Sequence, residues 1–203
     1  IVSIIIGLTT NNSFLGVIIL ITGILNSYYG SIGNKINFPI GVINNLALSY
    51  IAFKNNNYGL VIFNFLFFMP INIKSYFEWD KNSNKNLVKN RGLGIKKGLI
   101  TIILSIIIGM IVSYLLGLIP GERLTYLDSF TNVISLIAGI LLMLRYNESW
   151  ILYLINNVLD LILWIINYSS GGFDSLMVLL MSIMYLLINI YALFKWRSTD
   201  EKL

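Results

Sequence analysis

Hydrophobic positions group into seven long apolar segments, which are separated by polar turns and by one basic stretch. The segments cover residues 13–30, 37–54, 58–77, 98–119, 128–145, 149–168 and 173–195. A helix needs about 20 predominantly apolar residues to cross the hydrocarbon core of a bilayer. The pattern therefore predicts an all-α integral membrane protein with seven transmembrane helices.

Composition supports this class and excludes others. Of the 203 residues, 57% are hydrophobic and only 11% are charged, whereas soluble domains carry about 25% charged residues. Cysteine and histidine are both absent, so the usual residues of thiol catalysis, histidine catalysis and many metal sites are missing. We expect no catalytic residues, no metal and no cofactor. Residues 1–10 are too short to span a membrane and lack the basic region of a signal peptide; we expect them to end a longer helix.

The basic residues predict the orientation in the membrane. A basic loop occupies residues 80–97, and seven helices threaded from it place twelve of the fourteen Lys and Arg residues on its side. Only Lys54 and Arg123 fall on the other side. Basic loops stay in the cytoplasm, so we predict the N-terminus outside and the C-terminus inside. The net charge of +5 then reflects topology, and we expect a solvated loop and no nucleic-acid partner.

Internal similarity divides the chain into two units. The sequence ITGIL at 21–25 resembles IAGIL at 137–141, and two further pairs of positions match in order: Asn44-Asn45 with Asn156-Asn157, and Asn72 and Trp79 with Asn189 and Trp196. Such similarity indicates a duplicated three-helix unit. We predict a first unit in residues 1–79, the loop 80–97, a linker helix at 98–119 and a second unit in 120–203. Since one helix joins them, the units enter the membrane from the same side and are parallel, as in transporters that bind substrate near the midplane.

One segment carries polar and aromatic residues on a single helical face. Trp150, Tyr153, Asn157, Asp160 and Trp164 follow helical spacing in residues 149–168. A charged side chain in hydrocarbon costs about 2.5–3.5 kcal/mol on insertion scales, so this stripe should face the protein interior or a cavity. Aromatic rings beside an amide and a carboxylate suit a flat, polar ligand, and a cationic ring would gain from both. An aromatic belt at the membrane surface is the rival interpretation for the first two residues.

Polar seams also occur on neighbouring helices. They include Asn64, Asn72, Ser135 and Asn189, which we take as candidate binding residues. Small and polar seams also pack membrane helices against each other, and this alternative stays open. Tyr76, Trp79 and Trp196 lie at helix ends, where we expect them to be interfacial anchors.

Several motifs resemble a known family. In the second half these are TYLDSFTNVISLIAGILLMLRYNESWILYLINNVL, and in the first half FPIGVINN, Tyr58-Gly59 and FMPINIKSYFEW. Across nearly the whole chain they resemble the PnuC vitamin-transporter family, whose best-known members carry nicotinamide riboside. The resemblance implies a SWEET-like arrangement of three, one and three helices, a bacterial inner (plasma) membrane location, and a homo-oligomer, with a trimer as the expected form. It also implies facilitated diffusion with intracellular phosphorylation that traps the substrate.

The resemblance also assigns roles to residues. Trp150, Tyr153 and Asn157 would line the pocket for the ring, and Asn45, Asn64 and Asn189 would contribute from other helices. Two positions depart from the pattern of riboside carriers: Gly139 stands where they tend to have Gln, and Tyr153 stands where they have a second Trp.

The sequence therefore predicts a nicotinamide riboside transporter and leaves alternatives open. A sister transporter for thiamine or another ring vitamin would use the same stripe, and Asp160 would serve a proton-coupled version. An intramembrane enzyme lacks an activated nucleophile or a pair of carboxylates. A membrane subunit that only binds a partner would tolerate Trp150→Ala and Asn157→Ala without loss of uptake.

Overall fold

The structure, a computed structural model, describes residues 13–84 and 87–200. Within these residues all seven predicted helices are present, the third as three consecutive pieces. They are α2 (Phe14–Ser31), α3 (Asn37–Lys54), α4 (Tyr58–Phe63) with the π-helical turn η1 (Asn64–Phe68) and α5 (Met69–Lys81), α6 (Ile95–Leu116), α7 (Thr125–Met143), α8 (Ser149–Ser169) and α9 (Ser175–Asp200). A short hairpin of β1 (Ser83–Asn84) and β2 (Leu87–Val88), which the sequence analysis missed, lies in the basic loop. The longer helix expected at residues 1–10 falls outside the described residues.

Six of these helices are long and apolar enough to cross a membrane. The exception within the described ranges is α3, which is as long as α2 but carries Asn37, Asn44, Asn45 and Ser49. The packing of α3 against α2 and α5 explains how these side chains are tolerated. Polar residues in a membrane segment need a protein neighbour.

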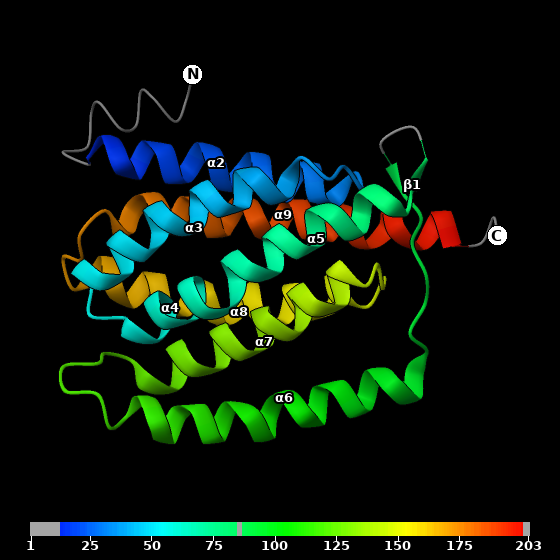
Figure 1. Cartoon of the computed structure of the whole chain (residues 1–203). Helices are drawn as coiled ribbons and strands as arrows, with labels where there is room; N and C mark the ends of the chain where they lie inside the picture. The colour runs from blue at the N-terminus through cyan, green and yellow to red at the C-terminus, as the bar shows by residue number, and fades with distance from the viewer. Residues whose placement is uncertain (1–12, 85–86, 201–203) are drawn as a thin grey trace.

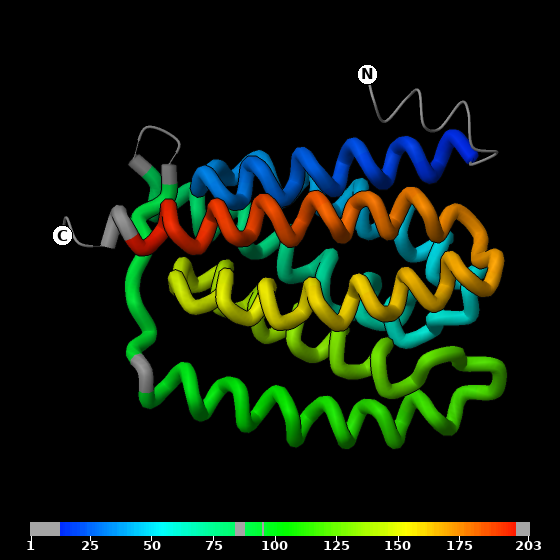
Figure 2. The backbone as a smooth tube through the Cα atoms, turned by 180° about the vertical axis from the view of Figure 1, so that it is seen from behind, coloured from blue at the N-terminus to red at the C-terminus, as the bar shows by residue number. Residues whose placement is uncertain are grey.

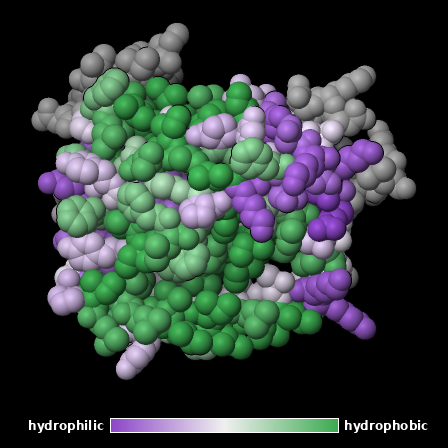
Figure 3. Space-filling view, in the orientation of Figure 1, coloured by the Kyte–Doolittle hydropathy of each residue, from purple (hydrophilic) through white to green (hydrophobic). Residues whose placement is uncertain are grey.

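The helices lie side by side in one bundle (Figures 1 and 2). Helix α2 packs against α3 and α9, α9 against α8, and α8 against α7. Helix α6 lies at the edge and packs on α7. The hairpin and the α2–α3 and α7–α8 turns lie at one end, which we call the loop end. Hydrophilic residues gather there, whereas the flank of the bundle is mainly hydrophobic (Figure 3).

The α2–α3 and α7–α8 turns have the same backbone form. Each has one residue in the left-handed region, Gly33 at φ 74° and Arg145 at φ 68°, and these residues are 112 positions apart. Helices α2 and α7 likewise end at Ser31 and Met143. The Asn44-Asn45 match to Asn156-Asn157 keeps this spacing. The ITGIL and IAGIL match does not: it is displaced by four residues, one helical turn, because apolar helices resemble one another at several registers.

The loop between α5 and α6 packs on both turns. Val88 N donates to Gly33 O at 3.0 Å, and Arg91 N donates to Arg145 O at 2.9 Å. The Glu148 carboxylate accepts from Leu93 N at 2.8 Å. The expectation of a merely solvated loop is therefore wrong for these residues, because their backbone groups bond to both halves of the bundle.

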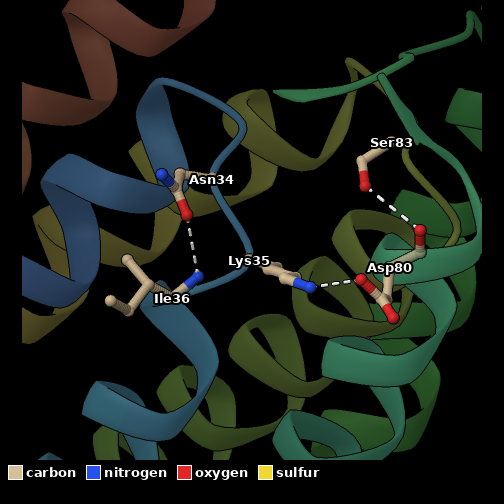
Figure 4. A network of polar contacts seen from close by, with 5 residues as sticks. All are labelled: Asn34, Lys35, Ile36, Asp80 and Ser83. Atoms are coloured by element: carbon tan, nitrogen blue, oxygen red, sulfur yellow. Dashed lines mark hydrogen bonds and ion pairs between the residues drawn. The ribbon is translucent and has the colours of Figure 1, made fainter. Parts of the chain in front are cut away.

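An ion pair adds to this junction. Lys35, in the α2–α3 turn, pairs with Asp80 near the end of α5 (Figure 4). In the same view Ser83 Oγ donates to Asp80 O at 3.1 Å, and Ile36 N donates to Asn34 Oδ1 at 3.0 Å. The first turn, the end of α5 and the start of the hairpin are thus held together at the loop end.

Three tryptophans fill the core at the loop end. Trp79 is 0% exposed and Trp196 is 4% exposed, so the prediction that these two are interfacial anchors is wrong. Trp79 Nε1 donates to Leu142 O of α7 at 3.0 Å, and Trp196 Nε1 donates to Ser31 O of α2 at 2.9 Å. Trp196 also packs edge-on against Trp150 with ring centroids 5.5 Å apart. Trp79 and Trp196 thereby each join the third helix of one predicted unit to the first helix of the other.

Two carboxyl groups cap α4 at the opposite end. Glu122 Oε2 accepts from Tyr58 N at 2.7 Å and from Gly59 N at 3.2 Å, and Asp128 Oδ2 accepts from Leu60 N at 3.2 Å. They satisfy N–H groups that a helix start leaves without intrahelical partners. The Asp128 carboxyl lies very close to the backbone of α4, because a Cβ atom on Gly59 would lie 2.4 Å from Asp128 Oδ2.

Glu122 should make stability depend on pH. Burial raises the pKa of this loop carboxyl above its ordinary value of 4.5, against the opposing effect of its hydrogen bonds. The folded protein then holds this proton more tightly than the unfolded chain, so the stabilisation is present at low pH and is lost as the pH rises through the raised pKa. Glu122→Gln keeps an acceptor but removes this dependence. We expect the melting temperature of the wild type in detergent, relative to Glu122→Gln, to fall from pH 4.5 to 8. The same change of melting temperature with pH in both proteins would contradict this prediction.

Candidate functional site

Two adjoining cavities lie inside the bundle. The first has a volume of about 180 Å³ and the second about 120 Å³. The second lies nearer the loop end, since Gly30, Leu142 and Trp150 line it. Five residues line both cavities and are called here the dividing residues: Asn26, Ser135, Tyr153, Asp160 and Tyr185.

The structure brings all ten candidate residues to these cavities. Asn45, Asn64, Asn72 and Trp164 line the first, and Trp150, Asn157 and Asn189 line the second. The remaining three, Ser135, Tyr153 and Asp160, are dividing residues. The stripe on α8 therefore faces the interior, as its spacing predicted.

Polar atoms without partners border the second cavity. Asn37 Oδ1, Trp150 Nε1, Asn156 Oδ1 and Asn157 Nδ2 are buried and make no hydrogen bond to the described protein. A buried polar group left unpaired costs about 1–3 kcal/mol, and most such groups in proteins are paired. These two donors and two acceptors can bond to a polar ligand placed in this cavity.

A π-helical turn presents Asn64 to the first cavity. Neither Nδ2 nor Oδ1 of Asn64 has a partner in the described protein, and the side chain is 1% exposed. Pro70 follows η1 and lacks the N–H group that would bond to the carbonyl of Leu66 in an α-helix. The α-helical hydrogen bond to the Leu66 carbonyl is therefore missing, so this turn is held less strongly in α-helical geometry. Single π turns inside α-helices are frequent at functional sites.

Sequence reasoning missed several lining residues. Asn26 Nδ2 donates to Asn37 O at 2.7 Å, so these two line the second cavity as a bonded pair. Asn44 was treated only as part of the repeat, but it lines the first cavity and donates to Ile19 O at 2.9 Å. Asparagine is so abundant in this chain that residue type alone did not single out these three. Tyr185 of α9 was not among the candidates either, and only the fold shows that it lines both cavities.

Asp160 accepts a hydrogen bond from its own helix. Asn156 Nδ2 donates to Asp160 Oδ2 at 2.8 Å, one turn along α8. The two positions that depart from the riboside-carrier pattern also meet, because the Tyr153 hydroxyl lies 3.5 Å from where a Cβ atom on Gly139 would be. Both positions contribute to the first cavity.

Comparison with known proteins places the chain in a family. A family model described as "Nicotinamide mononucleotide transporter" matches residues 13–198. The chain belongs to this family. It is therefore a multi-pass membrane transporter and not an enzyme.

Individual relatives agree with this placement. The nicotinamide riboside transporter PnuC of Neisseria mucosa is 28% identical over 198 residues, which is 94% of this chain and 74% of that protein. The protein of the same name from Haemophilus influenzae is 28% identical over 197 residues, covering 95% of this chain and 83% of its own length. A solved structure described as the vitamin B3 transporter PnuC superposes with a TM-score of 0.87 at 26% identity, covering 99% of this chain and 88% of that one.

Proposed function

We propose that this protein carries nicotinamide riboside across the bacterial inner membrane by facilitated diffusion. The observation that carries the proposal is the second cavity, where Asn37, Trp150, Asn156 and Asn157 present polar atoms without protein partners. The nicotinamide ring would lie against Trp150 and Tyr153, with its amide bonded by these atoms. The ribose hydroxyls would extend towards the asparagines of the first cavity.

The charge of the cavities favours the riboside over the mononucleotide named by the family model. Among the described residues that line them there is no Lys or Arg, and the one ionisable acid is Asp160. A phosphate group would lack a basic partner and would lie in the same site as a carboxylate. Removing such a charge from water without a partner is very costly.

The proposed architecture is two parallel three-helix units, α2 to α5 and α7 to α9, joined by α6 in a SWEET-like arrangement. The matching turns at Gly33 and Arg145 support it, as do the reciprocal bonds of Trp79 and Trp196. One unit would rock against the other to expose the site to each side in turn. The loop end would be cytoplasmic, phosphorylation in the cell would trap the product, and the protein would form a homo-oligomer, with a trimer as the expected form.

A sister transporter for thiamine or another ring vitamin is the second candidate. The contact between Tyr153 and Gly139 favours it, because a tyrosine hydroxyl stands near the space where riboside carriers tend to place a Gln side chain. This change alters the polar groups available to the ligand beside the first cavity.

Ligand binding separates these candidates. Titration calorimetry on the purified protein in detergent should detect nicotinamide riboside and give no heat with the mononucleotide, thiamine or riboflavin under the same conditions. Binding of thiamine without the riboside would replace the first candidate by the second. Uptake into liposomes that follows a pH gradient at equal substrate concentrations would instead support proton coupling through Asp160.

A further inference from the structure

Asp160 has an unusual place among the dividing residues. It lines both cavities, whereas Trp150 and Trp164 on the same stripe each line one. A ligand that extends from one cavity into the other must therefore pass the carboxylate of Asp160. The other dividing residues, Asn26, Ser135, Tyr153 and Tyr185, contribute uncharged groups.

The contacts of Asp160 do not require a negative charge. Asn156 Nδ2 donates to Oδ2, and an amide oxygen at position 160 would accept the same bond. No Lys or Arg belongs to either lining within the described residues. A carboxylate removed from water is costly unless a cation compensates it, so the bundle itself leaves this charge uncompensated.

We infer that Asp160 is the residue by which the site selects a positively charged ring over an uncharged ring of the same shape. This inference rests on the proposed function. It adds that the site distinguishes substrates with the same carbon skeleton by the charge of the ring. The cation would supply the charge that the protein lacks. The carboxylate, in turn, would stabilise the cationic ring near the boundary of the two cavities, where the ligand passes from one cavity into the other during transport.

A matched pair of ligands tests the inference. Nicotinamide riboside carries a positive ring, and its reduced 1,4-dihydro form is neutral and nearly the same size. Calorimetry near pH 8 should show that the wild type prefers the cationic form by roughly 10- to 100-fold, the ratio expected for one charge pair about 6–12 Å apart at an effective dielectric constant of about 20. Equal affinities in the wild type would overturn the inference without any variant.

Variants then assign the preference to Asp160. Asp160→Asn keeps the bond from Asn156 and should weaken the cationic form by the same 10- to 100-fold, while binding of the neutral form stays unchanged. Asp160→Glu should retain a preference for the cation. Asp128→Asn is the matched control, since this carboxyl is buried in the same bundle but lines neither cavity, and the ratio should not change.

The outcomes separate the inference from the proposed function. If Asp160→Asn still prefers the cation, or loses both forms equally, the inference is wrong and the function stands. If the wild type binds neither form, the proposed substrate is wrong and the inference falls with it. Because each result is a ratio within one protein, differences in stability between variants cancel.

Discussion

Replacing Asn157 by Leu should weaken binding of nicotinamide riboside by about 100-fold and leave the melting temperature unchanged or higher. Leu has nearly the shape of Asn, and Asn157 Nδ2 bonds to nothing in the described protein. The fold therefore loses no hydrogen bond, whereas the ligand loses a donor in a site shielded from water. Calorimetry and thermal unfolding in the same detergent measure the two effects together.

Asn44→Leu is the matched control for this prediction. Its Nδ2 donates within the protein, to Ile19 O at 2.9 Å and to Thr22 Oγ1 at 3.0 Å. The same substitution there removes two hydrogen bonds that α3 makes to α2 and should lower the melting temperature. If instead Asn157→Leu lowered stability as Asn44→Leu does and bound the riboside normally, Asn157 would be a packing residue.

Trp79→Ala should destabilise the protein by about 3–5 kcal/mol, the usual cost of truncating a fully buried aromatic side chain. Trp79 is 0% exposed, and its ring packs edge-on against Phe38 at 4.7 Å between centroids. Its loss would leave a cavity where the two predicted units meet. Denaturant-induced unfolding in mixed micelles gives the free energy of unfolding.

Three further variants interpret that loss. Tyr114→Ala on α6 removes an aromatic ring that is 71% exposed and should change the free energy of unfolding little. Trp79→Phe and Trp196→Phe keep most of the volume but remove the bonds to Leu142 O and Ser31 O, so each should cost about 1–3 kcal/mol. A Trp79→Ala effect no larger than that of Tyr114→Ala would contradict the buried role.

Hydrophobic pattern was enough to predict the helices, because membrane spans need long apolar runs and little else. The ends of α3 at Asn37 and Lys54 agree with the prediction. The stripe on α8 was also predictable, since polar groups at helical spacing cannot face lipid. The positions of Trp79 and Trp196 were not, because a tryptophan near a helix end has the same pattern whether it faces the membrane surface or a neighbouring helix.

Residues that share one face of a single helix could be predicted from the sequence, but contacts between residues of different helices could not. Asn26 and Asn37 come from different helices, and their hydrogen bond depends on how α2 and α3 pack. The loop 80–97 reads as a basic linker because it is rich in Lys, yet backbone groups at Val88 and Arg91 bond to two distant turns. Long-range backbone bonds of this kind leave no signal in residue type.

The π turn at Asn64–Phe68 has a consequence for helical phase. Asn64 and Asn72 are eight positions apart, and in an uninterrupted α-helix they would point about 80° away from each other. A π turn takes up one extra residue, which rotates the later part of the helix back by about one residue's worth of angle. Both asparagines therefore face the first cavity, and the third helix presents amides from two turns as though they belonged to one continuous row.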